Sequence, residues 1–406
     1  MAMKTAKKSN FKKPTVVVGV GTSAGGTAAL KQFFGGLQKT SSIAFIIVQH
    51  TDENGKALAL DVLKSVSTLP VFEIENGTKL QAQAVYLAPP HTCVSIQEGA
   101  FTIESCETRE SSDAVIDHLF KSLAAAYTMK SVGVILSGEG NDGSLGLRTL
   151  SEQGGMTIVQ DPETADYRTM PESALDTGNV DHTLRPNAMG LQLQSYEDYI
   201  LNVIEGKALH SLRDQIGLSL HKICAILLKE THHDFKHYKT TTLIRRIQRR
   251  MQVLQIEAAE VYIKKLEQSQ HEVDALFKEL LINVTSFFRD PEAFESLREE
   301  VIAKTLPQLP KDQKYRVWVA GCSTGEEVYT LAIMIQEEIL KLDRKVEVQI
   351  IATDIDDVAL NIARKGSYPL TIASNVSPER LAKHFQKRAG RYHVNKEIRE
   401  MCLFSA

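Results

Sequence analysis

The stretch that decides the fold is Thr15-Val-Val-Val-Gly-Val-Gly-Thr-Ser-Ala-Gly-Gly-Thr-Ala-Ala-Leu30. Its β-branched run predicts a buried strand, its glycines a tight turn, and its alanines the start of a helix. Gly19, Gly21 and Ala24 fit the looser G-x-G-x-x-A pattern of dinucleotide-binding loops, which hold a phosphate at a helix N-terminus. The same residues also spell G-x-S-x-G, which would present Ser23 as a nucleophile on a sharp bend. A plain strand-to-helix turn is the third reading, and this stretch alone does not decide among them.

The composition is that of an ordinary globular protein and excludes several classes of function. The 406 residues carry a net charge of −3, so nothing global indicates nucleic acid or a membrane surface. Residues 1–13 are basic and polar, which predicts a disordered lead-in rather than a secretory signal. The five cysteines are scattered, and His232, His233 and His237 lack a partner pattern, so we expect no metal site. We expect a cytoplasmic protein of two or three domains without membrane insertion.

Two further reactive side chains follow predicted strands. The apolar run 42–50 reads as a parallel strand covered on both faces, and it ends in His50. A dinucleotide fold would place an acid here, and Asp52 lies close enough to keep that reading open. Asp142 follows another buried strand, at 131–136. Because parallel strands end at the same edge of a sheet, we expect Ser23, His50 and Asp142 to meet there.

Five motifs resemble the catalytic domain of the chemotaxis protein-glutamate methylesterases (CheB type), over roughly residues 14–193. They are G-T-S-A-G-G around Ser23, V-Q-H at His50, Y-L-A-P-P-H at 86–91, S-G-x-G-x-D-G at Asp142 and M-P at Met170. The resemblance implies a doubly wound α/β domain with a parallel sheet and a catalytic triad. It also implies hydrolysis of glutamate γ-methyl esters, and deamidation of glutamine, on the cytoplasmic helices of methyl-accepting chemotaxis receptors, without a cofactor.

The chemistry of these residues agrees with that role. A serine hydroxyl is a weak nucleophile, so His50 would take its proton and a buried Asp142 would orient the imidazole ring. Backbone amides near the serine would hold the oxyanion, with Thr22, Ala24, Glu139 and Gly140 as its neighbours. The family more often has methionine or a small residue at position 139, and an inward carboxylate there would repel the developing charge. The family's usual receiver domain is missing ahead of the first strand, so we expect no control by its phosphorylation.

The second half of the sequence begins with helices. Residues 194–217 read as a helical linker with a break near Gly206, and residues 218–300 as a basic all-α subdomain. Within it, the segment 241–254 places four arginines beside an apolar face: Arg245, Arg246, Arg249 and Arg250. These arginines are either a solvated charged face or a docking surface for an acidic helix.

Residues 301–406 repeat the opening architecture. A strand and glycine turn at 316–327 precede a second strand that ends in Asp354, where a ribose-binding acid belongs. With Asn283-Val-Thr-Ser-Phe-Phe-Arg-Asp-Pro291 and the basic helix, these motifs resemble the chemotaxis receptor methyltransferases (CheR type), which bind S-adenosylmethionine. The resemblance implies six cofactor or active-site positions: Asn283, Thr285, Arg289, Gly321, Glu326 and Asp354.

The methyltransferase family usually builds a seven-stranded sheet, whereas this sequence supplies only two or three strands before Ala406. We therefore expect an incomplete Rossmann-like domain without useful methyltransferase activity, joined to a complete esterase. One alternative is a non-catalytic scaffold that binds receptor helices. Another, which rests on the glycine pattern alone, is a nicotinamide oxidoreductase.

Overall fold

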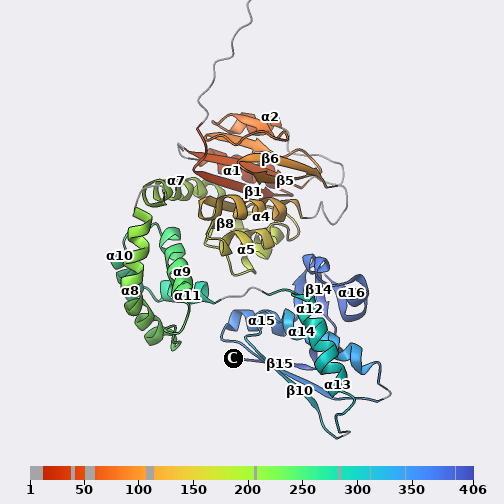
Figure 1. Ribbon diagram of the computed structural model, residues 1–406. Helices are drawn as coiled ribbons and strands as arrows, with labels where there is room; N and C mark the ends of the chain where they lie inside the picture. Colours follow the sequence, from red (N-terminus) through yellow and green to blue (C-terminus); the bar gives the residue numbers. More distant parts are fainter. Residues whose placement is uncertain are drawn as a thin grey trace, which may run out of the picture. The chain divides into compact units, whose positions relative to one another are not determined.

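The structure is a computed structural model that describes residues 12–37, 42–50, 60–106, 114–204, 208–281, 285–310, 312–342, 344–388 and 390–406. The chain forms two compact units, Met1–Phe277 and Lys278–Ala406 (Figure 1). Within the described residues, no helix combines the length and the apolar character needed to span a membrane.

The first unit is built on a seven-stranded sheet in the order β3-β4-β2-β1-β7-β8-β9, in which every neighbouring pair is parallel. The strands are β1 (Val16–Thr22), β2 (Ile43–Gln49), β3 (Val71–Glu73), β4 (Ala84–Leu87), β7 (Ser131–Ile135), β8 (Met156–Gln160) and β9 (His182–Leu184). The central strands β1 and β7 are buried along their whole length, because helices cover both faces of the sheet. The predicted parallel α/β fold is confirmed.

One helical layer holds α1 (Gly26–Gly35), α2 (Leu60–Val66) and α7 (Met189–Tyr199), and the other holds α4 (Val115–Tyr127), α5 (Ser144–Glu152) and α6 (Thr169–Leu175) (Figure 1). Helix α4 packs directly on β1. A Cβ at Gly19 would lie 2.6 Å from Leu123 Cδ1, and one at Gly21 would lie 2.4 Å from Ile116 Cγ2. These two glycines therefore allow helix packing, which explains the G-x-G pattern without a phosphate.

A hairpin of β5 (Thr92–Gln97) and β6 (Ala100–Ser105) packs against α4. A disulfide joins Cys93 to Cys106 across this hairpin, with Cα atoms 5.7 Å apart. The scattered spacing of the cysteines gave no sign of the pair, because strand pairing brings the two residues together.

Four helices complete the first unit, although the last of them runs past its end: α8 (Ala208–Thr231), α9 (Thr240–Val253), α10 (Ala259–Gln268) and α11 (Gln270–Leu280). A π-helical turn, η4 (Ile200–Ile204), follows α7. The expected break near Gly206 lies outside the described residues. The short 3₁₀ turns of this unit are η1 (Thr128–Lys130), η2 (Pro162–Thr164) and η3 (Pro186–Ala188).

The second unit contains a parallel sheet in the order β10-β11-β15 and an antiparallel sheet in the order β12-β14-β13. Its strands are β10 (Tyr315–Ala320), β11 (Val348–Thr353), β12 (Ser367–Pro369), β13 (Phe385–Arg388), β14 (Arg391–Val394) and β15 (Cys402–Ser405). Its helices are α12 (Pro291–Leu297), η5 (Arg298–Ile302), α13 (Ala303–Thr305), α14 (Glu326–Ile339), α15 (Asp357–Lys365), η6 (Leu370–Ser374), α16 (Pro378–His384) and α17 (Lys396–Arg399).

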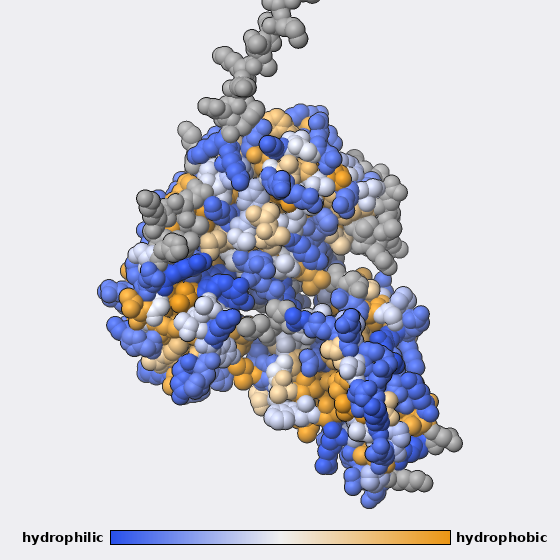
Figure 2. Space-filling view, viewed as in Figure 1, coloured by the Kyte–Doolittle hydropathy of each residue, from blue (hydrophilic) through white to orange (hydrophobic). Residues whose placement is uncertain are grey.

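Helix α14 contributes more buried residues to the core of the second unit than any other helix. Phe294 and Leu297 of α12 pack against the same core, so α12 belongs to this unit although its sequence reads as part of the helical subdomain. On the other side of the parallel sheet, Trp318 and Leu403 align through Ile351 and are 72% and 55% exposed. Apolar side chains on the surface of this unit are visible in Figure 2. One face of the sheet is thus largely uncovered.

Candidate active site

Three chemically competent side chains meet at the carboxyl edge of the first sheet. Ser23 follows β1 and His50 follows β2, and the amide of His50 donates to the Thr22 carbonyl at 3.2 Å. Asp142 lies on the loop after β7, which flanks β1 on its other side. His50 Nε2 and Asp142 Oδ2 are 2.7 Å apart, in a hydrogen bond between residues 92 positions apart in the sequence. The structure therefore brings the predicted histidine and aspartate into contact beside the serine.

Asp142 is buried, and main-chain amides fix its carboxylate. Ile116 donates to Oδ2 at 2.8 Å, and Asp117 and Gly143 donate to Oδ1 at 2.9 and 2.7 Å. The first two amides belong to the N-terminal turn of α4, where helix amides lack internal partners and the dipole favours a negative charge. Sequence reasoning missed this contribution, since α4 lies about 25 residues before Asp142.

The turn after β1 leaves amides available beside the serine. Its left-handed residue is Gly25, with φ of 73°, and Ser23 is not among the described residues with positive φ. Within the described part of the chain, the amides of Ala24 and Gly25 have no hydrogen-bond acceptor. The Thr22 hydroxyl donates to the Ser137 carbonyl at 2.9 Å, so this side chain connects the end of β1 to the loop after β7.

The loop after β7 lies against the serine. A Cβ at Gly138 would lie 2.9 Å from Ser23 Cβ and 2.6 Å from Met170 Cε, so this position has no room for a side chain. Glu139 is exposed, so the structure does not contain the inward carboxylate that would repel an oxyanion. The Gly140 amide donates to Thr169 Oγ1 at 3.3 Å, which makes it a poor candidate for an oxyanion donor.

A second cluster of predicted residues lies at the carboxyl ends of β10 and β11. Asp354 Oδ2 accepts from the Ser323 amide at 2.6 Å, and its Oδ1 accepts from the Asp356 amide at 2.9 Å. Gly321 is left-handed with φ of 73°, and a Cβ there would meet open space. Glu326, at the start of α14, accepts from Thr324 Oγ1 at 2.5 Å. An acid and an open glycine turn are thus placed together, as the sequence predicts.

Three other predicted positions of this half precede the sheet. Asn283 lies outside the described residues. Thr285 is half-buried and Arg289 is exposed. Between them, Phe287 packs edge-on against Tyr368, whose hydroxyl donates to the Thr324 carbonyl in the glycine turn. This chain of contacts links the segment to the turn.

Known families match all three regions of the chain. The family described as CheB methylesterase matches residues 18–193, the CheR methyltransferase all-alpha domain matches residues 218–281, and the CheR methyltransferase SAM binding domain matches residues 283–406. A Leptospira interrogans protein with the provisional name protein-glutamate methylesterase/protein-glutamine glutaminase is 34% identical over 166 residues, which cover 41% of this chain and 86% of that protein. The chain belongs to the CheB methylesterase family.

Two further matches extend the comparison. A 104.1 kDa Rhodobacter capsulatus protein from the hypE 3′ region, described as uncharacterized, is 33% identical over 359 residues, or 83% of this chain. The chain spans 37% of that protein's length. The crystal structure of the Thermotoga maritima CheB methylesterase catalytic domain is 29% identical, with a TM-score of 0.40, and the match covers 44% of this chain and 96% of that domain.

Most arginines of α9 are buried within the first unit, contrary to both sequence readings. Arg249 is 4% exposed and pairs with Asp181 at 2.9 Å. Arg250 binds Glu272 through two hydrogen bonds of 3.0 and 2.7 Å. Arg246 is also buried, and only Arg245 of the four is exposed. A docking surface or a solvated face requires exposed guanidinium groups, so the prediction is wrong for three of the four residues.

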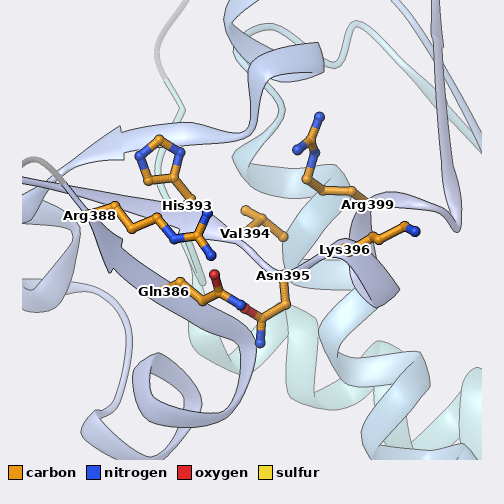
Figure 3. A pocket seen from close by; sticks show the side chains of 7 residues that line it. All are labelled: Gln386, Arg388, His393, Val394, Asn395, Lys396 and Arg399. Carbon is orange, nitrogen blue, oxygen red and sulfur yellow. The ribbon is translucent and has the colours of Figure 1, made fainter.

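The CheR-type half also contains a basic pocket that sequence reasoning did not single out. Its volume is about 280 Å³, and it lies where β13 and β14 meet α17 (Figure 3). Three cationic side chains line it, together with Gln386, His393, Val394 and Asn395: Arg388, Lys396 and Arg399. In Figure 3 the Arg388 and Gln386 side chains point toward Asn395. No sequence spacing marked this pocket, because strand pairing and a helical turn assemble it.

Proposed function

We propose that the first unit is a serine hydrolase of protein-glutamate methylesterase type, with Ser23 as nucleophile, His50 as general base and Asp142 as the residue that orients the base. The observation that carries the proposal is the 2.7 Å hydrogen bond between His50 Nε2 and Asp142 Oδ2 beside Ser23. A carboxylate in this position selects the tautomer of the imidazole and stabilises the imidazolium that forms during catalysis.

The proposed reaction proceeds through an acyl-enzyme. His50 removes the Ser23 proton while Oγ attacks the ester carbonyl, and the oxyanion accepts hydrogen bonds from the amides of Ala24 and Gly25. The imidazolium then protonates the leaving methoxide, which departs as methanol. Water attacks the acyl-enzyme by the same base catalysis and releases the glutamate carboxylate. With a glutamine side chain the same sequence releases ammonia.

The proposed substrates are methylated glutamates and glutamines on the cytoplasmic helices of chemotaxis receptors. This assignment follows from the family and from the names of relatives, which include protein-glutamate methylesterase and protein-glutamine glutaminase. The amino edge of the sheet, where α9 is bound, is opposite to Ser23, so the helical region does not compete for the carboxyl edge.

A fluorophosphonate labelling experiment tests the proposal. The full chain is expected to be labelled, and Ser23→Ala is expected to remain unlabelled. Methanol release from a methylated receptor fragment then tests the substrate, with Ser23→Ala and Glu139→Met beside the wild type. Because Glu139 is exposed, Glu139→Met is expected to retain the wild-type rate. Absence of labelling in the wild type would reject the hydrolase and favour the receptor-binding scaffold.

For the second half we propose S-adenosylmethionine as the ligand, held at the turn around Gly321 with Asp354 and Glu326 nearby. Carboxylates at the ends of such strands bind ribose hydroxyls, and a positively charged sulfonium is compatible with acidic surroundings. We also propose that the esterase domain spans 14–193, the linker 194–217 and the helical subdomain the residues from 218 onward. The packing of α12 favours ending that subdomain before residue 285.

A further inference from the structure

A second buried carboxyl group lies behind the candidate triad. Asp117, in the first turn of α4, is 1% exposed, and its amide is one of the donors to Asp142 Oδ1, at 2.9 Å. Its own Oδ1 accepts from the Gly146 amide at 2.6 Å, in the first turn of α5. Two hydrogen bonds therefore connect the helices. An amide of α4 binds Asp142, just before α5, and the Asp117 carboxylate of α4 binds an amide of α5.

The surroundings of Asp117 make its charge state adjustable. Its Oδ2 is buried and has no hydrogen-bond partner among the described residues. Burial raises the pKa of Asp117 to about 7, and the negative charge of Asp142 adds to the rise. The amides of Gly146 and Gly143, on the side of α5, and Lys121, one turn along α4, act in the opposite direction. Asp117 therefore changes charge in the pH range in which a histidine base operates.

We propose that Asp117 is a positioning residue of the esterase, which fixes Asp142 from behind and, when ionised, places a second negative charge behind the His50–Asp142 pair. The inference rests on the proposed function, because it assigns Asp117 a role in preparing His50 as the base. The mechanism above does not use this carboxyl group, and its distance in sequence from the serine and the histidine hides it from motif analysis.

Under this proposal, the charge on Asp117 changes the pH at which His50 loses its proton. A nearby negative charge favours the imidazolium, so His50 holds its proton to a higher pH when Asp117 is ionised. A purely structural Asp117 would act only through its hydrogen bonds, and its charge would leave the titration of His50 unchanged.

Titration of His50 by nuclear magnetic resonance tests the proposal. The full chain, labelled with ¹³C-histidine, is compared as wild type, Asp117→Asn and Asp198→Asn. Asparagine retains an oxygen that accepts from Gly146 but carries no charge, and Asp198 is an exposed helical aspartate that serves as the matched control. We expect the midpoint of the His50 titration to fall by roughly half a pH unit in Asp117→Asn and to stay unchanged in Asp198→Asn.

Superimposable His50 curves in wild type and Asp117→Asn would overturn the proposal and leave Asp117 a structural residue. If Asp117→Asn does not fold, the ¹³C carboxyl resonance of Asp117 in the wild type decides, because a group that stays protonated throughout the His50 titration contradicts the inference. Fluorophosphonate labelling separates the two proposals. Labelling without a His50 shift keeps the esterase and rejects the role of Asp117, whereas a shift without labelling rejects the esterase.

Discussion

Arg249 of α9 and Asp181, the residue before β9, form a buried ion pair of 2.9 Å that attaches the CheR-type helices to the CheB-type sheet. Nearby on α9, Gln252 Nε2 donates to the carbonyls of Met129 and Gly154 at 3.0 and 3.1 Å. All of these partners stand where β7, β8 and β9 begin, at the amino edge of the sheet. The attachment therefore leaves the carboxyl edge, with its candidate catalytic residues, uncovered by α9.

Removal of the Arg249 guanidinium should destabilise the first unit. Arg249→Ala removes the close cation of the buried Asp181 carboxylate and leaves it Arg250 at 4.0 Å, and breaking such a buried pair typically costs about 3 kcal/mol of the free energy of unfolding. The measurement is the urea midpoint of the far-UV circular dichroism transition. Arg245→Ala is the control, because Arg245 is exposed on the same helix, and its effect should stay within about 0.5 kcal/mol. Equal midpoints for the two variants would show that the ion pair does not stabilise the unit.

The hydrogen bond between His50 and Asp142 predicts a large kinetic effect. Asp142→Asn keeps the size of the side chain but no longer favours the correct imidazole tautomer, so ester hydrolysis should fall by roughly 10³- to 10⁴-fold. Initial rates of methanol release measure the loss. Asp198→Asn, an exposed exchange of the same kind, should retain the wild-type rate. A loss smaller than tenfold in Asp142→Asn would remove Asp142 from the triad.

The part of the fold that could be predicted from the sequence is the part encoded by local pattern. The apolar runs at β1, β2 and β7 predicted buried strands, and the predicted runs 42–50 and 131–136 each end one residue past the observed strand. The convergence of Ser23, His50 and Asp142 followed from the rule that parallel strands end at one edge. These inferences needed only periodicity and topology.

The features that the sequence did not predict depend on contacts between distant segments of the chain. The arginine spacing of α9 does not reveal Asp181, which lies 68 residues away from Arg249. The sequence therefore predicted exposed arginines where the structure has a buried ion pair. Gly19 and Gly21 fitted a phosphate-binding loop because the residues next to them in the sequence do not indicate that α4 packs on them. Asp117 was passed over because a buried aspartate inside an apolar helical face has no local signature. Tertiary packing decides each of these cases.

Gly138 offers a test of the space around the serine. A methyl group there would collide with Ser23 Cβ at 2.9 Å and with Met170 Cε at 2.6 Å. A displacement of the nucleophile by about 1 Å typically costs 10²-fold in rate, so Gly138→Ala should be labelled by fluorophosphonate roughly 100 times more slowly. Gly35→Ala is the control, since a Cβ at Gly35 meets nothing within 4 Å. Equal labelling rates would mean that the loop yields without moving Ser23.

The raised pKa of Asp117 predicts a pH-dependent stability. Between the ordinary value of 3.8 and about 7, the folded state binds more protons at this group than the unfolded state. Stability therefore falls as pH rises through this window, and the contribution is fully lost above it. Asp117→Asn removes this term, so its free energy of unfolding should decline less steeply from pH 4 to 7 than that of the wild type. Parallel declines in urea titrations at several pH values would contradict the shift.

Asp354 should determine ligand binding in the second unit. Asp354→Ala removes the acceptor of the Ser323 and Asp356 amides, so it loosens the glycine turn and deletes the acid proposed to hold the ribose. Affinity for S-adenosylhomocysteine, measured by calorimetry on the full chain, should fall at least tenfold, or about 1.4 kcal/mol. Asp357→Ala, an exposed acid at the start of α15, should bind as the wild type does. Equal affinities in the two variants would move the cofactor away from Asp354, and a wild type that does not bind would reject the cofactor assignment.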